Sequence, residues 1–85
     1  MSGQPKLSPA QLRFLEAAYR FDEQYPGAYF SWHMFGRMYK TAHVLERLGM
    51  IWSLRSDISF YRLTVAGREL IERHIAEREQ KGART

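Results

Sequence analysis

Residues 41–63 read TAHVLERLGMIWSLRSDISFYRL, and the spacing of their apolar side chains changes at Gly49. Before Gly49 the apolar positions recur at the interval of one face of a helix: Thr41, Val44, Leu45 and Leu48. The same projection places a mainly basic and polar set on the opposite, exposed face: Tyr39, Lys40, His43, Glu46 and Arg47. This half of the stretch therefore predicts an amphipathic helix that ends at Gly49.

After Gly49 the pattern becomes extended. Residues 50–54 are followed by a turn at residues 55–57 and by an alternating segment up to Leu63. In that segment Ile58, Phe60 and Arg62 fall on one side, and Ser59, Tyr61 and Leu63 fall on the other. The sequence therefore predicts a β-hairpin directly after the helix.

Two further helices carry recognisable start signals. Ser8 as N-cap, Pro9 at the first helical position and Gln11 three residues after the cap form a capping box. This helix is expected to end near Gln24, because the Tyr-Pro-Gly sequence that follows disfavours helical geometry. Thr64 is expected to cap the last helix, whose predicted buried stripe is Leu70, Ile71, His74 and Ile75.

Residues 29–39, YFSWHMFGRMY, are rich in aromatic side chains. Ser31 can cap a short helix there, with Trp32 and Phe35 on one side and Gly36 as its terminator. We expect the aromatic residues of this region to form the core. The alternative is a base-stacking platform for single-stranded nucleic acid, made of Tyr25, Tyr29, Phe30, Trp32 and Phe35.

These elements predict a mainly α fold with a small β-hairpin, of the α+β class, in the order α-α-α-β-β-α. With 85 residues, 45% of them hydrophobic, the chain has room for one domain with one core. We place that domain at residues 8–79, between a flexible N-terminus (1–7) and a disordered C-terminal tail (80–85). The chain has no cysteine and no segment apolar enough to span a membrane, so a cytoplasmic protein is expected.

Two segments, HVLERLGMI (residues 43–51) and FYRLTVAGRELIERH (residues 60–74), carry a resemblance to a known family. The first is similar to the end of a recognition helix running into a wing strand, and the second to the other wing strand and a closing helix. Together, over about residues 8–78, the chain resembles bacterial winged helix-turn-helix regulators of the MarR-like and PadR-like kind. The resemblance implies sequence-specific binding of double-stranded DNA, as in a transcriptional regulator.

In such a domain the N-terminal part of the third helix enters the major groove, where the base edges differ between base pairs. The resemblance therefore implies that Tyr39, Lys40 and His43 lie nearest the bases and that Arg47 holds the backbone, with Thr41 completing the helix set. Phosphate contacts, which supply most of the affinity, are expected from Ser31, Arg37, Arg55 and Arg62. Arg55, on the wing, is also expected to reach the adjacent groove.

The distribution of charge agrees with this placement. The net charge is +4, and residues 36–62 hold five basic side chains against two acidic ones, whereas residues 1–35 hold three of each. Because this charge is modest, we expect a homodimer on a palindromic DNA site. Leu7 and the outer faces of the first and last helices are candidates for the dimer seam.

The alternative function is a protein–protein adaptor, in which a winged helix buries Trp52 or Tyr39 against a partner in a larger assembly. Enzyme chemistry is not expected, because His33, His43 and His74 lie on different predicted elements without metal-ligand spacing. The sequence also has no phosphate-binding glycine loop and no nucleophile elbow. No cofactor, metal or small-molecule ligand is therefore expected.

Overall fold

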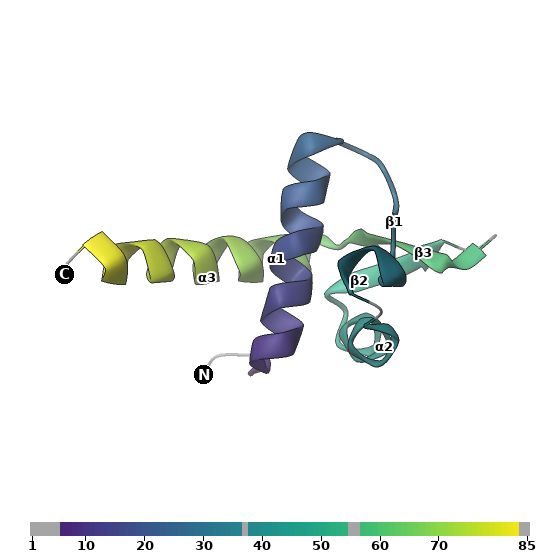
Figure 1. Ribbon diagram of the computed structural model, residues 1–85, viewed down its shortest axis with the longest axis horizontal. Helices are drawn as coiled ribbons and strands as arrows, with labels where there is room; N and C mark the ends of the chain where they lie inside the picture. Colours follow the sequence, from purple (N-terminus) through teal and green to yellow (C-terminus); the bar gives the residue numbers. More distant parts are fainter. Residues whose placement is uncertain (1–5, 37, 55–56, 84–85) are drawn as a thin grey trace.

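The computed structural model describes residues 6–36, 38–54 and 57–83. Within them lie α1 (Pro9–Gln24), β1 (Phe30–Ser31), the 3-10 turn η1 (Trp32–Phe35), α2 (Tyr39–Arg47), β2 (Ile51–Leu54), β3 (Asp57–Leu63) and α3 (Val65–Ala83). The strands form one antiparallel sheet in the order β1-β3-β2 (Figure 1). The described chain is therefore mainly helical with a small sheet, in agreement with the predicted α+β class. None of the described helices is long and apolar enough to cross a membrane.

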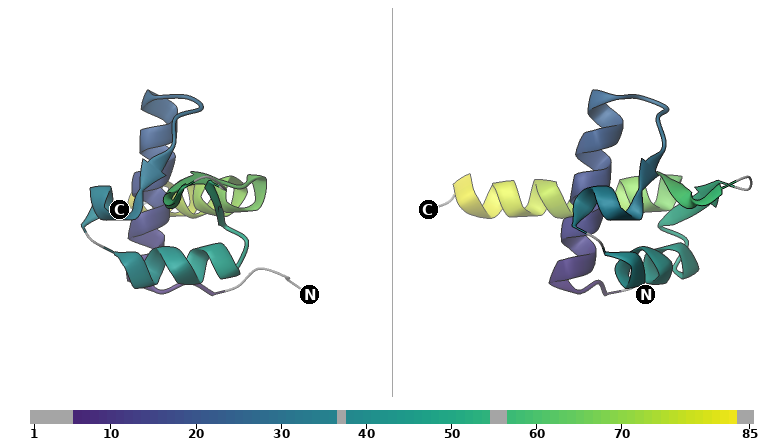
Figure 2. Two further views of the ribbon diagram at one scale, coloured as in Figure 1. Left: turned by 90° about the vertical axis from the view of Figure 1, so that its right-hand side faces the viewer. Right: turned by 45° about the vertical axis from the view of Figure 1, so that its right-hand side comes forward.

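The helices and the hairpin extend in different directions from a common centre. α3 crosses α1 and leaves the molecule on the side opposite to the hairpin of β2 and β3 (Figure 1). α2 lies beside the first half of α1 and below the sheet in all three views (Figure 2). The outer surface of α2 and the hairpin are therefore at the same end of the molecule, away from most of α3.

The core fills the space between α1, α2, the start of α3 and one face of the sheet. Its buried apolar side chains are Phe14, Leu15, Ala18, Phe30, Ala42, Leu45, Met50, Ile51, Tyr61, Leu70 and Ile71. The Phe30 ring meets Phe14 and Phe35 at centroid distances of 5.9 and 5.3 Å. Phe30 and Phe35 thus belong to the core as predicted, whereas Tyr25 is 52% exposed at the end of α1.

The predicted second helix is reduced to the single turn η1, and a strand precedes it. Phe30 and Ser31 pair with Tyr61 and Phe60 of β3, which commits the backbone of residues 30 and 31 to the sheet. Only Trp32–Phe35 remain for a helical turn before Gly36, whose φ of 100° ends it. The order of elements therefore differs from the predicted order in having β1 and in lacking a full second α-helix.

The ends of the predicted helices agree with the structure where a local cap fixes them. In α1 the Ser8 N–H donates to Gln11 Oε1 (2.8 Å) and the Gln11 N–H donates to Ser8 Oγ (3.2 Å), which is the predicted capping box. In α3 Leu70 and Ile71 are buried and His74 and Ile75 are half-buried, as predicted. α3 continues to Ala83, beyond the expected domain end at residue 79.

A close contact joins the start of α3 to the beginning of β2. The Thr64 hydroxyl accepts the Gly67 N–H (3.0 Å) and donates to the carbonyl oxygen of Gly49 (2.6 Å), so the predicted N-cap also anchors the turn after α2. Gly67 is buried, and a Cβ at this position would lie 2.0 Å from the Met50 carbonyl oxygen. Glycine is therefore required at residue 67 for α3 to approach the backbone of Met50.

Candidate nucleic-acid interface

The outward face of α2 carries four exposed side chains at helical spacing: Lys40, His43, Val44 and Arg47. Tyr39, which is 54% exposed, stands at the start of the same helix, and its ring is stacked on that of His43 at a centroid distance of 6.3 Å. One surface of a nine-residue helix thus presents two cations, an imidazole, a phenol and a small apolar group.

The inward face of α2 differs from the predicted one. Ala42 and Leu45 are fully buried and Met38 packs against the core, whereas Val44 and Leu48 are 38% and 40% exposed. The prediction that Val44 and Leu48 belong to the buried face of this helix was therefore wrong, because the helix turns the side of Ala42 toward the core. Thr41, at the edge of this face, is half-buried. As a result, Val44 joins the surface next to Lys40 and Arg47.

Glu46 is separated from the cations of α2. Its carboxylate accepts a hydrogen bond of 2.6 Å from the Ser53 hydroxyl of β2, and the side chain is half-buried rather than exposed as predicted. Burial, followed by the negative charge of Glu46, raises the pKa of the neighbouring Tyr61. Neither Lys40 nor Arg47 forms an ion pair with another residue in the part of the chain that the structure describes.

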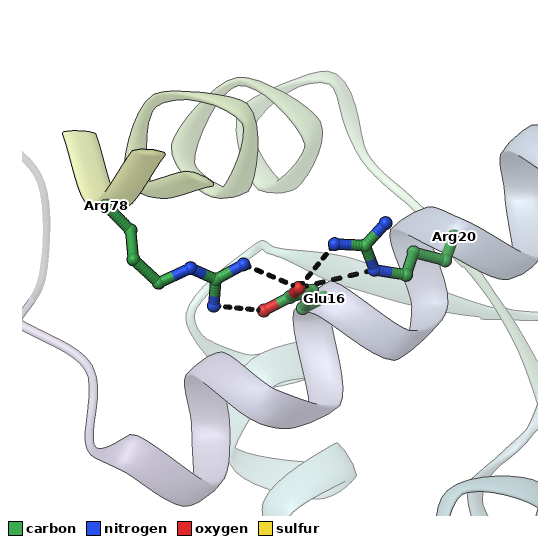
Figure 3. A network of polar contacts seen from close by, with 3 residues as sticks. All are labelled: Glu16, Arg20 and Arg78. Carbon is green, nitrogen blue, oxygen red and sulfur yellow. Dashed lines mark hydrogen bonds and ion pairs between the residues drawn. The ribbon is translucent and has the colours of Figure 1, made fainter. Parts of the chain in front are cut away.

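The ion pairs of the described residues all lie within or between α1 and α3. Glu16 of α1 accepts two hydrogen bonds of 2.8 Å from Arg78 and is also bound by Arg20 (Figure 3). Hydrogen bonds from Arg78 and then from Arg20 lower the pKa of Glu16 to about 2. Arg68 of α3 bonds to Asp22 of α1 and lies near Glu72. Carboxylates therefore neutralise cations at the α1–α3 end, while no carboxylate of the described residues forms an ion pair with a cation of α2.

Other residues of the expected DNA-binding set lie apart from this face. Ser31 is only 2% exposed, and its hydroxyl is hydrogen-bonded to His33 Nδ1 (2.8 Å), so it is not on the surface. Arg62 belongs to the face of the sheet that is turned away from the core. Arg37 and Arg55 lie outside the described residues. The structure thus brings together Tyr39, Lys40, His43 and Arg47 of the expected set.

The outer face of the sheet carries a second cluster, which we call the sheet platform: Tyr29, Trp52, Phe60 and Arg62. Trp52 of β2 is paired directly with Arg62 of β3. The Tyr29 ring contacts Trp52 edge-to-face at 5.8 Å and lies 5.7 Å from the guanidinium carbon of Arg62. Sequence reasoning placed Phe60 and Arg62 on one side of the hairpin but did not associate them with Trp52 and Tyr29, because that requires the strand register.

Comparison with known proteins finds no matching family model, no matching curated protein and no matching solved structure.

Proposed function

We propose that this protein binds double-stranded DNA as a winged helix-turn-helix transcriptional regulator, with α2 in the major groove and the hairpin as a wing. The observation that carries the proposal is the exposed α2 face of Lys40, His43, Val44 and Arg47, whose cations have no ion pair among the described residues. A helix that offers uncompensated cations suits the phosphate-lined major groove. The succession of η1, α2 and the hairpin also supports this assignment.

Each side chain of this face has a role that DNA chemistry can use. Lys40 can donate to the O6 or N7 acceptors of guanine, and His43 can donate to or accept from a base edge. Val44, which lies between them and Arg47 on the helix surface, can contact a thymine methyl group. Arg47, one turn farther along, is suited to a phosphate. Specific and nonspecific contacts would thus come from one short helix.

The proposed DNA-bound form is a homodimer, since one such helix makes few phosphate contacts. An open cavity of about 380 Å³ between the start of α1 and α3 is lined by Leu7, Leu12 and Leu70 and by the polar residues Lys6, Arg73, His74 and Glu77. A second copy that packed there would cover apolar surface and leave both α2 helices free. Sedimentation of the protein with and without duplex DNA gives the stoichiometry.

The test is fluorescence anisotropy with a random-sequence duplex over a series of salt concentrations, comparing the protein with its Lys40→Ala/Arg47→Ala variant. We expect the affinity to fall steeply with salt. The variant should bind roughly tenfold more weakly or worse. Its salt slope should fall by about 1, since the phosphate contact of Arg47 is lost and each such contact contributes about 0.9. Circular dichroism checks that the variant is folded.

A matched control removes two cations from another surface. Arg13 and Arg20 are exposed on α1, and the Arg13→Ala/Arg20→Ala variant has the same net charge as the α2 variant. It should bind duplex DNA like the unmodified protein. Equal losses in the two variants would mean that only the overall charge attracts DNA, and the absence of duplex binding at low salt would favour the protein–protein adaptor.

A further inference from the structure

The sheet platform is an aromatic and cationic surface on the side of the sheet opposite to α2. Alternation along β3 sends Tyr61 into the core and leaves Phe60 and Arg62 on the outer face, and the register adds Trp52 beside Arg62. Trp52 is 39% exposed and Phe60 is 37% exposed. The rings of Trp52 and Phe60 are thus accessible to solvent and are not part of the apolar core.

Contacts within the platform hold three of its members in place. Tyr29 contacts both the ring of Trp52 (5.8 Å) and the guanidinium of Arg62 (5.7 Å), so three strand-borne or strand-flanking side chains form one cluster. Trp52 and Phe60 lie on neighbouring strands, on the same face and one row apart. Side chains that are held in this way lose little conformational entropy when a flat ligand stacks on them.

The chemistry of the platform identifies the class of ligand. Exposed rings stack on any nucleobase, because every base has a π-face, and an arginine beside them attracts the phosphate that joins two nucleotides. Among the side chains that form the platform, Arg62 carries the charge, and its guanidinium lies 5.7 Å from the Tyr29 ring. Rings for bases and a cation for phosphate fit an unpaired strand, whereas a duplex keeps its bases stacked inside.

We propose that the sheet platform binds single-stranded DNA, with bases stacked on Trp52 and Phe60 and a phosphate at Arg62. Stacking of bases on the platform does not depend on the proposed function of α2, but the choice of DNA over RNA rests on that proposed function. This site is separate from the duplex-binding face, because the two lie on opposite sides of the sheet. The two activities can therefore be lost independently.

The experiment measures the anisotropy of a labelled oligothymidylate with the protein and with its Trp52→Leu and Phe60→Leu variants. Each variant should bind the oligonucleotide about fivefold to a hundredfold more weakly, since stacking of one base is lost. Both should retain the duplex binding that the cations of α2 provide, because neither substitution removes a charge. An abasic oligonucleotide of equal length should bind weakly to every form of the protein.

Two controls separate this proposal from the proposed function. Tyr25→Leu removes another exposed ring, at the end of α1, and should leave oligothymidylate binding unchanged. Lys40→Ala/Arg47→Ala should lose the duplex and keep the oligothymidylate, so failure of one activity leaves the other measurable. The proposal is overturned if oligothymidylate does not bind, if Trp52→Leu binds it normally, or if oligouridylate binds more tightly. It is also overturned if Trp52→Leu converts a dimer to a monomer, which would make the platform an interface between copies.

Discussion

At the scale of single residues, Glu16 makes the stability of the protein depend on pH. Its pKa falls from 4.5 to about 2 because Arg78 and Arg20 bind the carboxylate in the folded state (Figure 3). Since the pKa is lower in the folded state, the stabilisation is complete above pH 4.5 and is lost as the pH falls toward about 2. Glu16→Gln should therefore lower the free energy of unfolding by about 1 kcal/mol near neutral pH, a modest value because both arginines are exposed to solvent.

Urea denaturation over a pH series measures this effect. The difference between Glu16→Gln and the unmodified protein should be constant near neutral pH and should narrow below pH 4.5. Glu69→Gln is the matched control, because Glu69 is exposed on α3 and has no ion pair with another described residue. A Glu16→Gln difference that stayed constant down to pH 3 would contradict the assigned role of the two arginines.

At the scale of elements, the approach of α3 to β2 depends on Gly67. In an isolated helix, replacing glycine by alanine stabilises by about 1 kcal/mol. Here the added Cβ would lie 2.0 Å from the Met50 carbonyl oxygen, which is backbone and cannot turn aside. Gly67→Ala should therefore destabilise the fold by about 1–3 kcal/mol instead of stabilising it. The midpoint of urea denaturation measures this change. The neighbouring Ala66→Gly, at an exposed position, should cost only the helix propensity, and an increase in stability of Gly67→Ala would refute the close contact.

At the scale of the whole molecule, polar contacts fix the crossing of α1 and α3, which are far apart in sequence. Arg68 bonds to Asp22, and its guanidinium carbon lies 5.4 Å from the ring of Tyr19, whose hydroxyl donates to Glu72 (3.1 Å). Burial, followed by the carboxylates of Glu72 and Glu23, raises the pKa of Tyr19 to about 12, so its hydroxyl stays protonated and continues to donate. The cluster therefore links the end of α1 to the first half of α3.

A double-mutant cycle tests this link. Arg68→Met should destabilise the fold by about 1–3 kcal/mol, because Asp22 is only 16% exposed and would lose its partner. Adding Asp22→Asn should cost less in that background than in the unmodified protein, since the two residues interact directly. Strictly additive effects in thermal unfolding would show that Arg68 and Asp22 do not stabilise the crossing by pairing with each other.

Features that depend on neighbours within a few residues could be predicted from the sequence. The Ser8–Gln11 box, the Thr64 cap, the change of period at Gly49 and the stripe of α3 are local patterns, and the structure has them as predicted. The face of Tyr39, Lys40, His43 and Arg47 was also predictable, because polar side chains on a short helix remain outside.

Features that depend on pairing between distant residues emerged with the folded structure. The short second helix follows from the pairing of Phe30 with Tyr61, a contact that no local pattern encodes. In α2 two overlapping apolar stripes were available, and packing against α1 and the sheet selected the one through Ala42 and left Val44 exposed. The sheet platform likewise required the register of β2 on β3, because Trp52 and Arg62 become neighbours only when the strands pair. Burial and strand pairing stabilise contacts between residues that are distant in sequence, and the chain forms those contacts only when it folds.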